Sequence, residues 1–397
     1  MIPSFRPSYD FLAPQRIVFG WGRRVEVGKL AAALGIRAFI VSGSSTLERS
    51  GAVDEVCDAL SRAGVKPIRP DIPIQRREPE VDDVDRAARA LRALGPGKGD
   101  IVVALGGGSA MDLAKAACAM AVNSRSETVK DYLEGVGKGL GIEVEPLPLL
   151  ALPATAGTGS EATKNAVISS RDPPFKKSLR SDSMVPRAVI VDPELTVSVP
   201  PRITAATGMD AITQLIESYI SLRAAPIPQA LAIHGLALAA GAITRAVEDG
   251  KDRDARERMA HAALLSGMAL ANSGLGMAHG VAAALGIHAG IAHGLACAVM
   301  LPAALRANAA ARPREISRIG EVMCGARFDS DEDGVRAAIE RVEDLCRRVE
   351  IPGKLRDLGV KKEDLPAIAA SSRGNSMSGN PREISDAELS RILEEMF

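Results

Sequence analysis

Apolar and polar residues follow two different patterns along the chain. In the first half, short runs rich in aliphatic and β-branched residues alternate with stretches of helical periodicity. Several runs are apolar at consecutive positions, which is typical of parallel strands covered by helices on both faces of a sheet. The expected strands are 16–20, 37–43, 65–70, 101–109 and 147–155, and the expected helices are 25–34, 52–63, 81–94 and 111–122.

After about residue 194 the strand pattern ends and alanine-rich helical stretches take over. Prolines in the segment 192–201 interrupt the pattern between the two halves. We therefore expect a Rossmann-like α/β domain with a parallel sheet at 1–193, followed by an all-helical domain at 194–397. The expected helices of the second domain are 204–222, 227–247, 253–272, 278–310, 314–324 and 333–349.

Composition narrows the class of protein. A length of 397 residues suits two domains. The 49 basic residues balance 49 acidic ones, and there are only 1 Trp, 3 Tyr and 7 Phe, so a nucleic-acid binder is not expected. The cysteines are scattered, which indicates reduced thiols, and the N-terminus lacks the basic head and apolar run of a signal peptide. These features predict a cytoplasmic protein.

One long stretch carries no fixed charge. No Asp, Glu, Lys or Arg occurs between Met259 and Leu305, a length that could hold two membrane spans of about 20 residues each. The stretch also contains four histidines, Asn272 and many glycines, and polar groups inside a membrane are rare. We therefore expect closely packed core helices of the helical domain and no association with a membrane.

A glycine cluster lies between an expected strand and an expected helix. Gly106, Gly107 and Gly108 precede Ser109, where the helix opens. Glycines let the backbone approach a phosphate closely, and a helix N-terminus offers unpaired N–H groups, so this turn suits a pyrophosphate. The alternative is an ordinary tight turn. The segment 152–168 follows the next expected strand and adds hydroxyl groups that could line a dinucleotide or serve only as turn residues.

A second group of polar residues lies in the helical half. Asp210 and Gln214 are one turn apart on an expected helix and share one face. His279, His288 and His293 lie in the uncharged stretch. A carboxylate with imidazoles could hold a divalent transition metal, although a histidine in an apolar helix is more often an ordinary core residue.

Several of these segments together resemble the iron-containing (group III) alcohol dehydrogenase family. The similarity extends over nearly the whole chain, and the segments that carry it are RIVFGWG (16–22), GGGSAMDLAK (106–115), LPATAGTGSEAT (152–163), DPELT (192–196), TGMDAITQLIES (207–218), HGVAAALGIHAGIAHG (279–294) and NPRE (380–383). The resemblance implies the dehydroquinate synthase-like fold of that family. It also implies a metal-dependent, NAD(P)-linked alcohol dehydrogenase or aldehyde reductase. Such an enzyme passes hydride between nicotinamide C4 and a small alcohol or aldehyde.

The resemblance also implies roles for individual residues. The glycine turn would bind the pyrophosphate of NAD or NADP, and hydroxyl side chains would line the nicotinamide side. The implied cofactor residues are Gly43, Gly106, Gly107, Gly108, Ser109, Asp112, Thr155, Thr158, Ser160 and Lys176. The implied metal ligands are Asp210, Gln214, His279 and His293. Fe(II) is the first expectation, with Zn(II), Mn(II) or Ni(II) as alternatives, and relatives suggest a homodimer or larger homo-oligomer.

Three positions depart from the family pattern. Gln214 stands where the fourth metal ligand is usually His, and a neutral amide oxygen suits a transition metal less well. Ala283 replaces a histidine of the proton path, and His288 is not assumed to substitute for it. Gly43 replaces the Asp that binds the adenosine ribose in NAD-preferring relatives, so NADP is expected as well as NAD.

These departures leave alternative functions open. The enzyme could be specialised for an aldehyde that carries a carboxylate or phosphonate, since Lys177 and Arg180 lie near Lys176 in the sequence. It could instead be a degenerate nucleotide-binding member with weak or no metal. Glycerol dehydrogenases, 3-dehydroquinate synthases and maleylacetate reductases share the fold, but the complete glycine and TAGTGSE segments favour the alcohol dehydrogenase branch.

Overall fold

The computed structural model of the protein describes residues 8–74 and 77–397. The chain folds into two compact units, Ala13–Val199 and Pro200–Phe397, and residues 8–12 belong with the second. Two hydrogen bonds attach that short segment: the Leu12 N–H donates to Asn272 Oδ1 (2.5 Å), and Asn272 Nδ2 donates to the Leu12 carbonyl (2.7 Å). Residues 1–7 of the expected N-terminal domain lie outside the described residues.

The first unit contains a six-stranded, fully parallel sheet. Its strands are, in spatial order, β1 (Arg16–Phe19), β8 (Ala188–Val191), β5 (Leu149–Pro153), β4 (Asp100–Gly106), β2 (Arg37–Ser42) and β3 (Lys66–Ile68). Residues of β4 and β5 are buried throughout, as the apolar runs predicted. The predicted α/β fold with a parallel sheet is confirmed.

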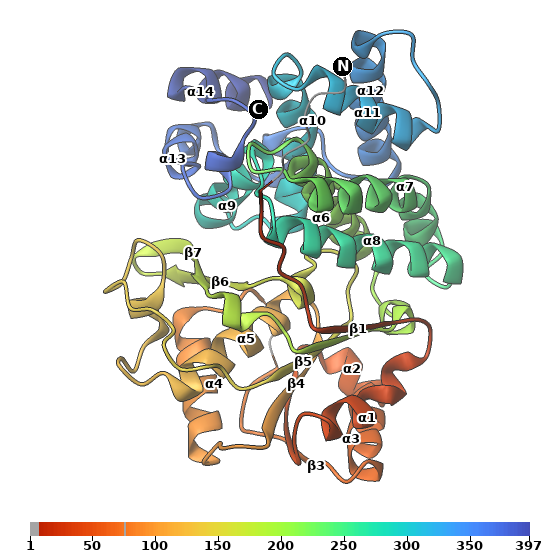
Figure 1. The fold of residues 1–397 in the computed structure, drawn as a ribbon. Helices are drawn as coiled ribbons and strands as arrows, with labels where there is room; N and C mark the ends of the chain where they lie inside the picture. Colours follow the sequence, from red (N-terminus) through yellow and green to blue (C-terminus); the bar gives the residue numbers. More distant parts are fainter. Residues whose placement is uncertain (1–7, 75–76) are drawn as a thin grey trace. The chain divides into compact units, whose positions relative to one another are not determined.

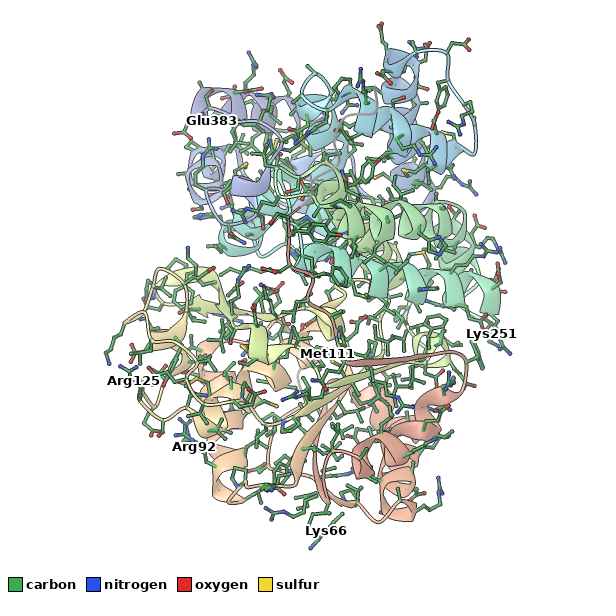
Figure 2. The ribbon with its side chains drawn as sticks, in the orientation of Figure 1. Lys66, Arg92, Met111, Arg125, Lys251 and Glu383 are labelled. Carbon is green, nitrogen blue, oxygen red and sulfur yellow. The ribbon has the colours of Figure 1, made fainter. Side chains whose placement is uncertain are left out.

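Helices lie on both faces of this sheet (Figure 1). They are α1 (Val27–Ala32), α2 (Ser45–Arg49), α3 (Ala52–Arg62), α4 (Val81–Ala93) and α5 (Gly108–Val122). Within the unit, Met111 of α5 is buried, whereas Lys66 and Arg125 project from its outer edge (Figure 2). This separation of apolar and charged side chains is the ordinary basis of a stable core.

Three strands were absent from the prediction. Besides β8, these are β6 (Asn165–Arg171) and β7 (Pro174–Arg180), which form an antiparallel hairpin. Buried and partly exposed positions alternate along β6, so the hairpin has no continuous apolar run like those of the central strands. The four-residue strand β8 is apolar but short and lies next to the prolines of the boundary segment.

The second unit is helical, as predicted. Its helices are α6 (Pro201–Ile220), α7 (Pro226–Glu248), α8 (Arg253–Ala271), α9 (Met277–Ala289), α10 (His293–Asn308), α11 (Pro313–Cys324), α12 (Asp331–Arg348), α13 (Leu365–Ser371) and α14 (Asp386–Glu395). The single helix expected over 278–310 is two helices. Gly290 ends α9 in the left-handed conformation (φ 66°), which glycine adopts without strain.

The uncharged stretch contributes to the interior of this unit. It spans most of α8, all of α9 and most of α10, and most of its large apolar side chains are buried. Among the described helices only α7 is long and apolar enough to cross a membrane by length and composition, and half of its most apolar window is buried in the structure. A core helix meets the same criterion.

Candidate functional site

Three helices of the second unit bring predicted ligands together. Asp210 lies on α6, His279 on α9 and His293 at the start of α10. Asp210 Oδ1 is 3.3 Å from His279 Nε2 and 3.9 Å from His293 Nε2. The two imidazole rings lie edge to face with centroids 5.5 Å apart. One ligand atom from each of these residues and from Cys297 lies within 4.8 Å of the others.

A glycine allows α10 to approach α6 closely. A Cβ at Gly294 would lie 2.5 Å from the Ala206 carbonyl oxygen and 3.2 Å from Asp210 Cβ. The first distance is far below van der Waals contact, so a larger residue at this position would push the helices apart. Gly294 therefore keeps the neighbouring His293 within reach of Asp210.

A second buried carboxylate orients His279. His279 Nδ1 lies 2.7 Å from Glu217 Oε2, and Glu217 also accepts hydrogen bonds from the N–H groups of Gly276 (3.0 Å) and Ala278 (2.7 Å). Glu217 follows Asp210 and Gln214 along one face of α6 and binds the N-terminus of α9, where negative charge is favoured. Donation from Nδ1 to Glu217 leaves the lone pair of His279 Nε2 facing Asp210.

Two buried polar atoms at this centre lack a hydrogen bond to any described residue. They are Asp210 Oδ1 and His279 Nε2, whose side chains are 1% and 3% exposed. Burial opposes charge on both residues, but His293 and His279 hold the pKa of Asp210 below its usual value, and Cys297 and Asp210 raise the pKa of His279 well above its own. A carboxylate oxygen and an imidazole nitrogen that face each other in a dry interior hold a cation between them, either a proton on His279 or a metal ion, and the donor types fit a divalent metal.

The fourth predicted ligand, Gln214, is oriented differently. Its Oε1 accepts a hydrogen bond from Ser266 Oγ (2.8 Å), and its Nε2 donates to Asp210 Oδ2 at 3.4 Å. The amide nitrogen, rather than the oxygen, is thus the atom placed against Asp210. Coordination by Gln214 stays a prediction, and it would require the amide to turn over.

Two other residues of the family-like segments, His288 and Asn380, make contacts of their own in this unit. His288 Nε2 lies 2.7 Å from Ser371 Oγ in an exposed contact, and nothing in this contact supports His288 as a replacement for the histidine absent at Ala283. Asn380 of the NPRE segment accepts a hydrogen bond from the Met277 N–H (3.1 Å) and so helps to hold the start of α9.

In the first unit, the glycine turn begins α5 directly after β4. Gly107 provides no side-chain cap, and its carbonyl accepts from the N–H groups of Ala110 (3.0 Å) and Met111 (3.1 Å). The N–H groups before these, those of Gly108 and Ser109, are the ones that an anion at this helix start would meet. A Cβ at Gly108 would lie 2.6 Å from Thr158 Oγ1, and one at Gly107 would lie 3.2 Å from Thr155 Oγ1. The turn and the predicted threonines are therefore in contact at the carboxyl ends of the neighbouring strands β4 and β5.

A buried network ties this loop to α5. Ser160 Oγ donates to Asp112 Oδ1 (2.5 Å), and Asp112 Oδ2 accepts from the Val167 N–H (3.0 Å). Lys115 is fully buried and donates to the Ser160 carbonyl (2.9 Å), to Thr163 Oγ1 (2.9 Å) and to the Asn165 carbonyl. Asp112 and Ser160, both predicted to contact the cofactor, thus use hydrogen-bonding groups to fix the loop that contains Ser160 against α5.

Two ionisable groups of this region are shifted by burial. Burial lowers the pKa of Lys115 and raises the pKa of Glu161 to about 7. Lys176, on β7, forms an ion pair with Glu78 (2.6 Å). Its predicted contact with cofactor stays a prediction.

Sequence comparison identifies the family. A profile of iron-containing alcohol dehydrogenases matches residues 14–193, and a profile of the C-terminal part of the Fe-containing alcohol dehydrogenase family matches residues 204–397. The chain belongs to the iron-containing alcohol dehydrogenase family. The resemblance expected from its motifs is confirmed.

Individual relatives agree over the whole length. Long-chain-alcohol dehydrogenase 1 of Geobacillus thermodenitrificans (strain NG80-2) is 33% identical over 393 residues, which cover 96% of each chain. A crystal structure of 1,3-propanediol oxidoreductase has a TM-score of 0.91 and 34% identity, and the match covers 98% of this chain and 100% of that one. Sulfoacetaldehyde reductase from Bifidobacterium kashiwanohense, solved with NAD+, has a TM-score of 0.86 and 32% identity over 98% and 99% of the two chains. The protein is thus an oxidoreductase that acts on CH–OH donors.

Sequence reasoning missed Glu217 as a functional residue of this family member. The sequence did contain an indication, because Glu217 comes seven residues after Asp210 and three after Gln214, which places it on the same face of a largely apolar helix. Such a carboxylate needs several donors when it is buried.

Glu217→Gln is expected to lower the affinity for divalent metal about 10- to 100-fold, because an amide holds the Nδ1–H of His279 less firmly than a carboxylate does. Metal titration of the chelator-treated protein measures the change. Glu340→Gln on α12 is the control and should leave affinity unchanged. Equal affinities of the Glu217→Gln and unmodified proteins would show that Glu217 does not position the ligand.

Close packing leaves no room for a side chain at Gly43. A Cβ there would lie 2.5 Å from Ala110 Cβ and 3.2 Å from Gly106 Cα. Gly43→Ala is therefore expected to destabilise the protein by about 1–3 kcal/mol. Thermal unfolding measures this, and Ala110→Gly in the same chain should recover part of the loss. Gly241→Ala, on α7 with open space around its Cβ, is the matched control. Unchanged stability of Gly43→Ala would contradict the close packing.

Proposed function

We propose that the protein is a metal-dependent alcohol dehydrogenase or aldehyde reductase linked to NAD or NADP. The observation that carries the proposal is the facing pair of buried atoms, Asp210 Oδ1 and His279 Nε2, in a family that contains iron. Asp210, His279 and His293 would hold the metal, and Gln214 was the fourth ligand predicted from sequence. Fe(II) remains the first expectation, with Zn(II), Mn(II) and Ni(II) as alternatives.

When bound, the metal supplies a Lewis acid for the substrate oxygen, and the nicotinamide supplies or accepts hydride at C4. The chain's own residues prepare the centre for this chemistry. Glu217 fixes the tautomer and orientation of His279. The apolar, closely packed helices around Asp210 exclude water and so strengthen the electrostatic interactions at the centre. His293 is 27% exposed, so this ligand offers the open side toward substrate.

The glycine turn would bind the pyrophosphate of the dinucleotide through the N–H groups at the start of α5. The turn consists of Gly106, Gly107, Gly108 and Ser109. Thr155 lies against Gly107, and Thr158 lies against Gly108. Because Gly43 lacks a carboxylate that would repel a 2′-phosphate, NADP is proposed as well as NAD. Ser44 caps α2 through the Thr46 N–H (3.0 Å), so its hydroxyl oxygen already serves the turn that follows β2.

The proposed substrate is a small alcohol or aldehyde. The anionic-aldehyde alternative is not better supported: Arg180, one of the two cations that suggested it, lies 3.8 Å from Glu134 in a partly exposed ion pair. We also propose a homodimer or larger homo-oligomer in the cytoplasm, with no membrane or nucleic-acid partner.

One experiment tests the proposal. The chelator-treated protein is reconstituted separately with Fe(II), Zn(II), Mn(II) and Ni(II), bound metal is measured, and oxidation of NADH and NADPH is followed with a panel of neutral and anionic aldehydes. We expect one bound metal per chain and turnover that depends on it. A protein that binds no metal and oxidises neither coenzyme would indicate a degenerate nucleotide-binding member instead.

A further inference from the structure

The metal centre contains a fourth donor that differs from the one predicted from sequence. Cys297 lies one turn after His293 on α10, so the two side chains share a face. Its Sγ is 3.8 Å from His293 Nε2, and it belongs to the group of ligand atoms that lie within 4.8 Å of one another. We propose that Cys297 supplies the fourth protein ligand in this chain, with Gln214 remaining outside the coordination sphere. This inference rests on the proposed metal-dependent function.

Independent observations favour a ligand over a chance buried thiol. The atoms next to it, Asp210 Oδ1 and His279 Nε2, are buried and lack a hydrogen bond to any described residue. The side chain of Cys297 is itself fully buried on the same side of the helix as His293. Carboxylate, imidazole and thiolate are all donors that Zn(II) binds, and four of them around one ion lie about 3.3–3.8 Å apart when metal bonds are about 2.0–2.3 Å long, with the substrate oxygen then entering as a fifth ligand. The cluster needs only a modest contraction to reach that geometry.

The hydrogen bonds of Gln214 explain why its amide oxygen does not coordinate the metal. Ser266 donates to its oxygen, and its nitrogen faces Asp210 Oδ2. With a metal on Oδ1, this nitrogen can continue to donate to the other carboxylate oxygen. Gln214 then acts as a partner of Asp210 that orients the carboxylate, the role that outer hydrogen bonds commonly have at metal sites.

The ligand set changes the expected metal. Thiolate is a soft donor that favours Zn(II) over Mn(II), whereas an amide oxygen shows the opposite tendency. On binding, the thiol S–H gives its proton to solvent and the sulfur bonds to the metal. Removing the thiol should therefore lower the affinity for Zn(II) by about tenfold or more, while the affinity for Mn(II) changes less.

X-ray absorption of the unmodified protein loaded with Zn(II) alone tests the sulfur ligand directly. We expect one sulfur neighbour at about 2.3 Å besides nitrogen and oxygen at about 2.0–2.1 Å. The same protein loaded with Co(II) should show a thiolate-to-metal charge-transfer band in the near ultraviolet. Neither readout depends on turnover or on the folding of a variant.

Variants assign the sulfur to Cys297. Cys297→Ser should still bind Co(II) but lose the charge-transfer band, whereas Cys346→Ser, a buried thiol on α12, and Gln214→Ala should keep it. Metal bound through nitrogen and oxygen alone, or a band that persists in Cys297→Ser, would overturn this inference and leave the proposed function standing. Absence of any bound metal in the unmodified protein would overturn both, and the metal content distinguishes the two failures.

Discussion

Asp210→Asn is expected to lower kcat/KM for aldehyde reduction by about a thousandfold, which corresponds to about 4 kcal/mol of transition-state stabilisation. The substitution keeps the shape of the side chain, and the amide oxygen can still accept the hydrogen bond from Gln214. It removes the negative charge that faces His279 Nε2 at 3.3 Å. Without that charge, a divalent cation in the buried centre loses its main electrostatic partner.

The measurement combines metal content with the rate of NADH and NADPH oxidation after reconstitution. Asp344→Asn provides the control, because Asp344 makes partly exposed ion pairs with Arg341 and Arg347 on α12, and such pairs contribute little. We expect the control to retain metal and activity. A fully active Asp210→Asn protein with its metal bound would refute the assignment of Asp210 as a ligand.

The central sheet could be predicted because each strand is a local signal. Apolar runs such as those of β4 and β5 are buried on both faces, and burial is what their composition reflects. The hairpin of β6 and β7 was missed because its register depends on pairing between segments rather than on a local run. The break between α9 and α10 depends on one left-handed glycine, Gly290, which the alanine-rich pattern conceals.

The ligands of the metal centre could also be predicted only in part, because one of them depends on contacts between helices. Asp210, His279 and His293 could be proposed from their motifs, and the structure brings them together. Cys297 could not be chosen, because nothing in the spacing of α10 says that its sulfur, rather than the amide of Gln214 on α6, lies in the group of ligand atoms. That choice depends on the close approach of two helices at Gly294, which is a property of packing in three dimensions.

A substitution at the start of α5 is expected to weaken coenzyme binding strongly. Gly108→Asp should raise the Kd for NADH and NADPH by about a hundredfold or more, because the new carboxylate takes the place where the N–H groups of the helix would hold a pyrophosphate. The new carboxylate is expected to affect the stability of the protein and the affinity for coenzyme in opposite directions. Asp in the first turn of a helix is favourable by about 0.3–1 kcal/mol, whereas a negative charge beside a phosphate is repulsive.

Gly108→Asn isolates the charge, since Asn has nearly the same size and meets the same atoms. A Cβ at this position already lies 2.6 Å from Thr158 Oγ1, so the threonine must move in both variants. We expect Asn to raise the Kd by about tenfold and Asp by at least another tenfold, with the difference between them shrinking at high salt. Fluorescence titration of the coenzyme measures each Kd, and thermal unfolding confirms that both proteins are folded. Equal Kd values for the Asp and Asn variants would mean that the coenzyme phosphates do not lie at this helix end, and the pyrophosphate site would then have to be sought elsewhere along the carboxyl ends of the strands.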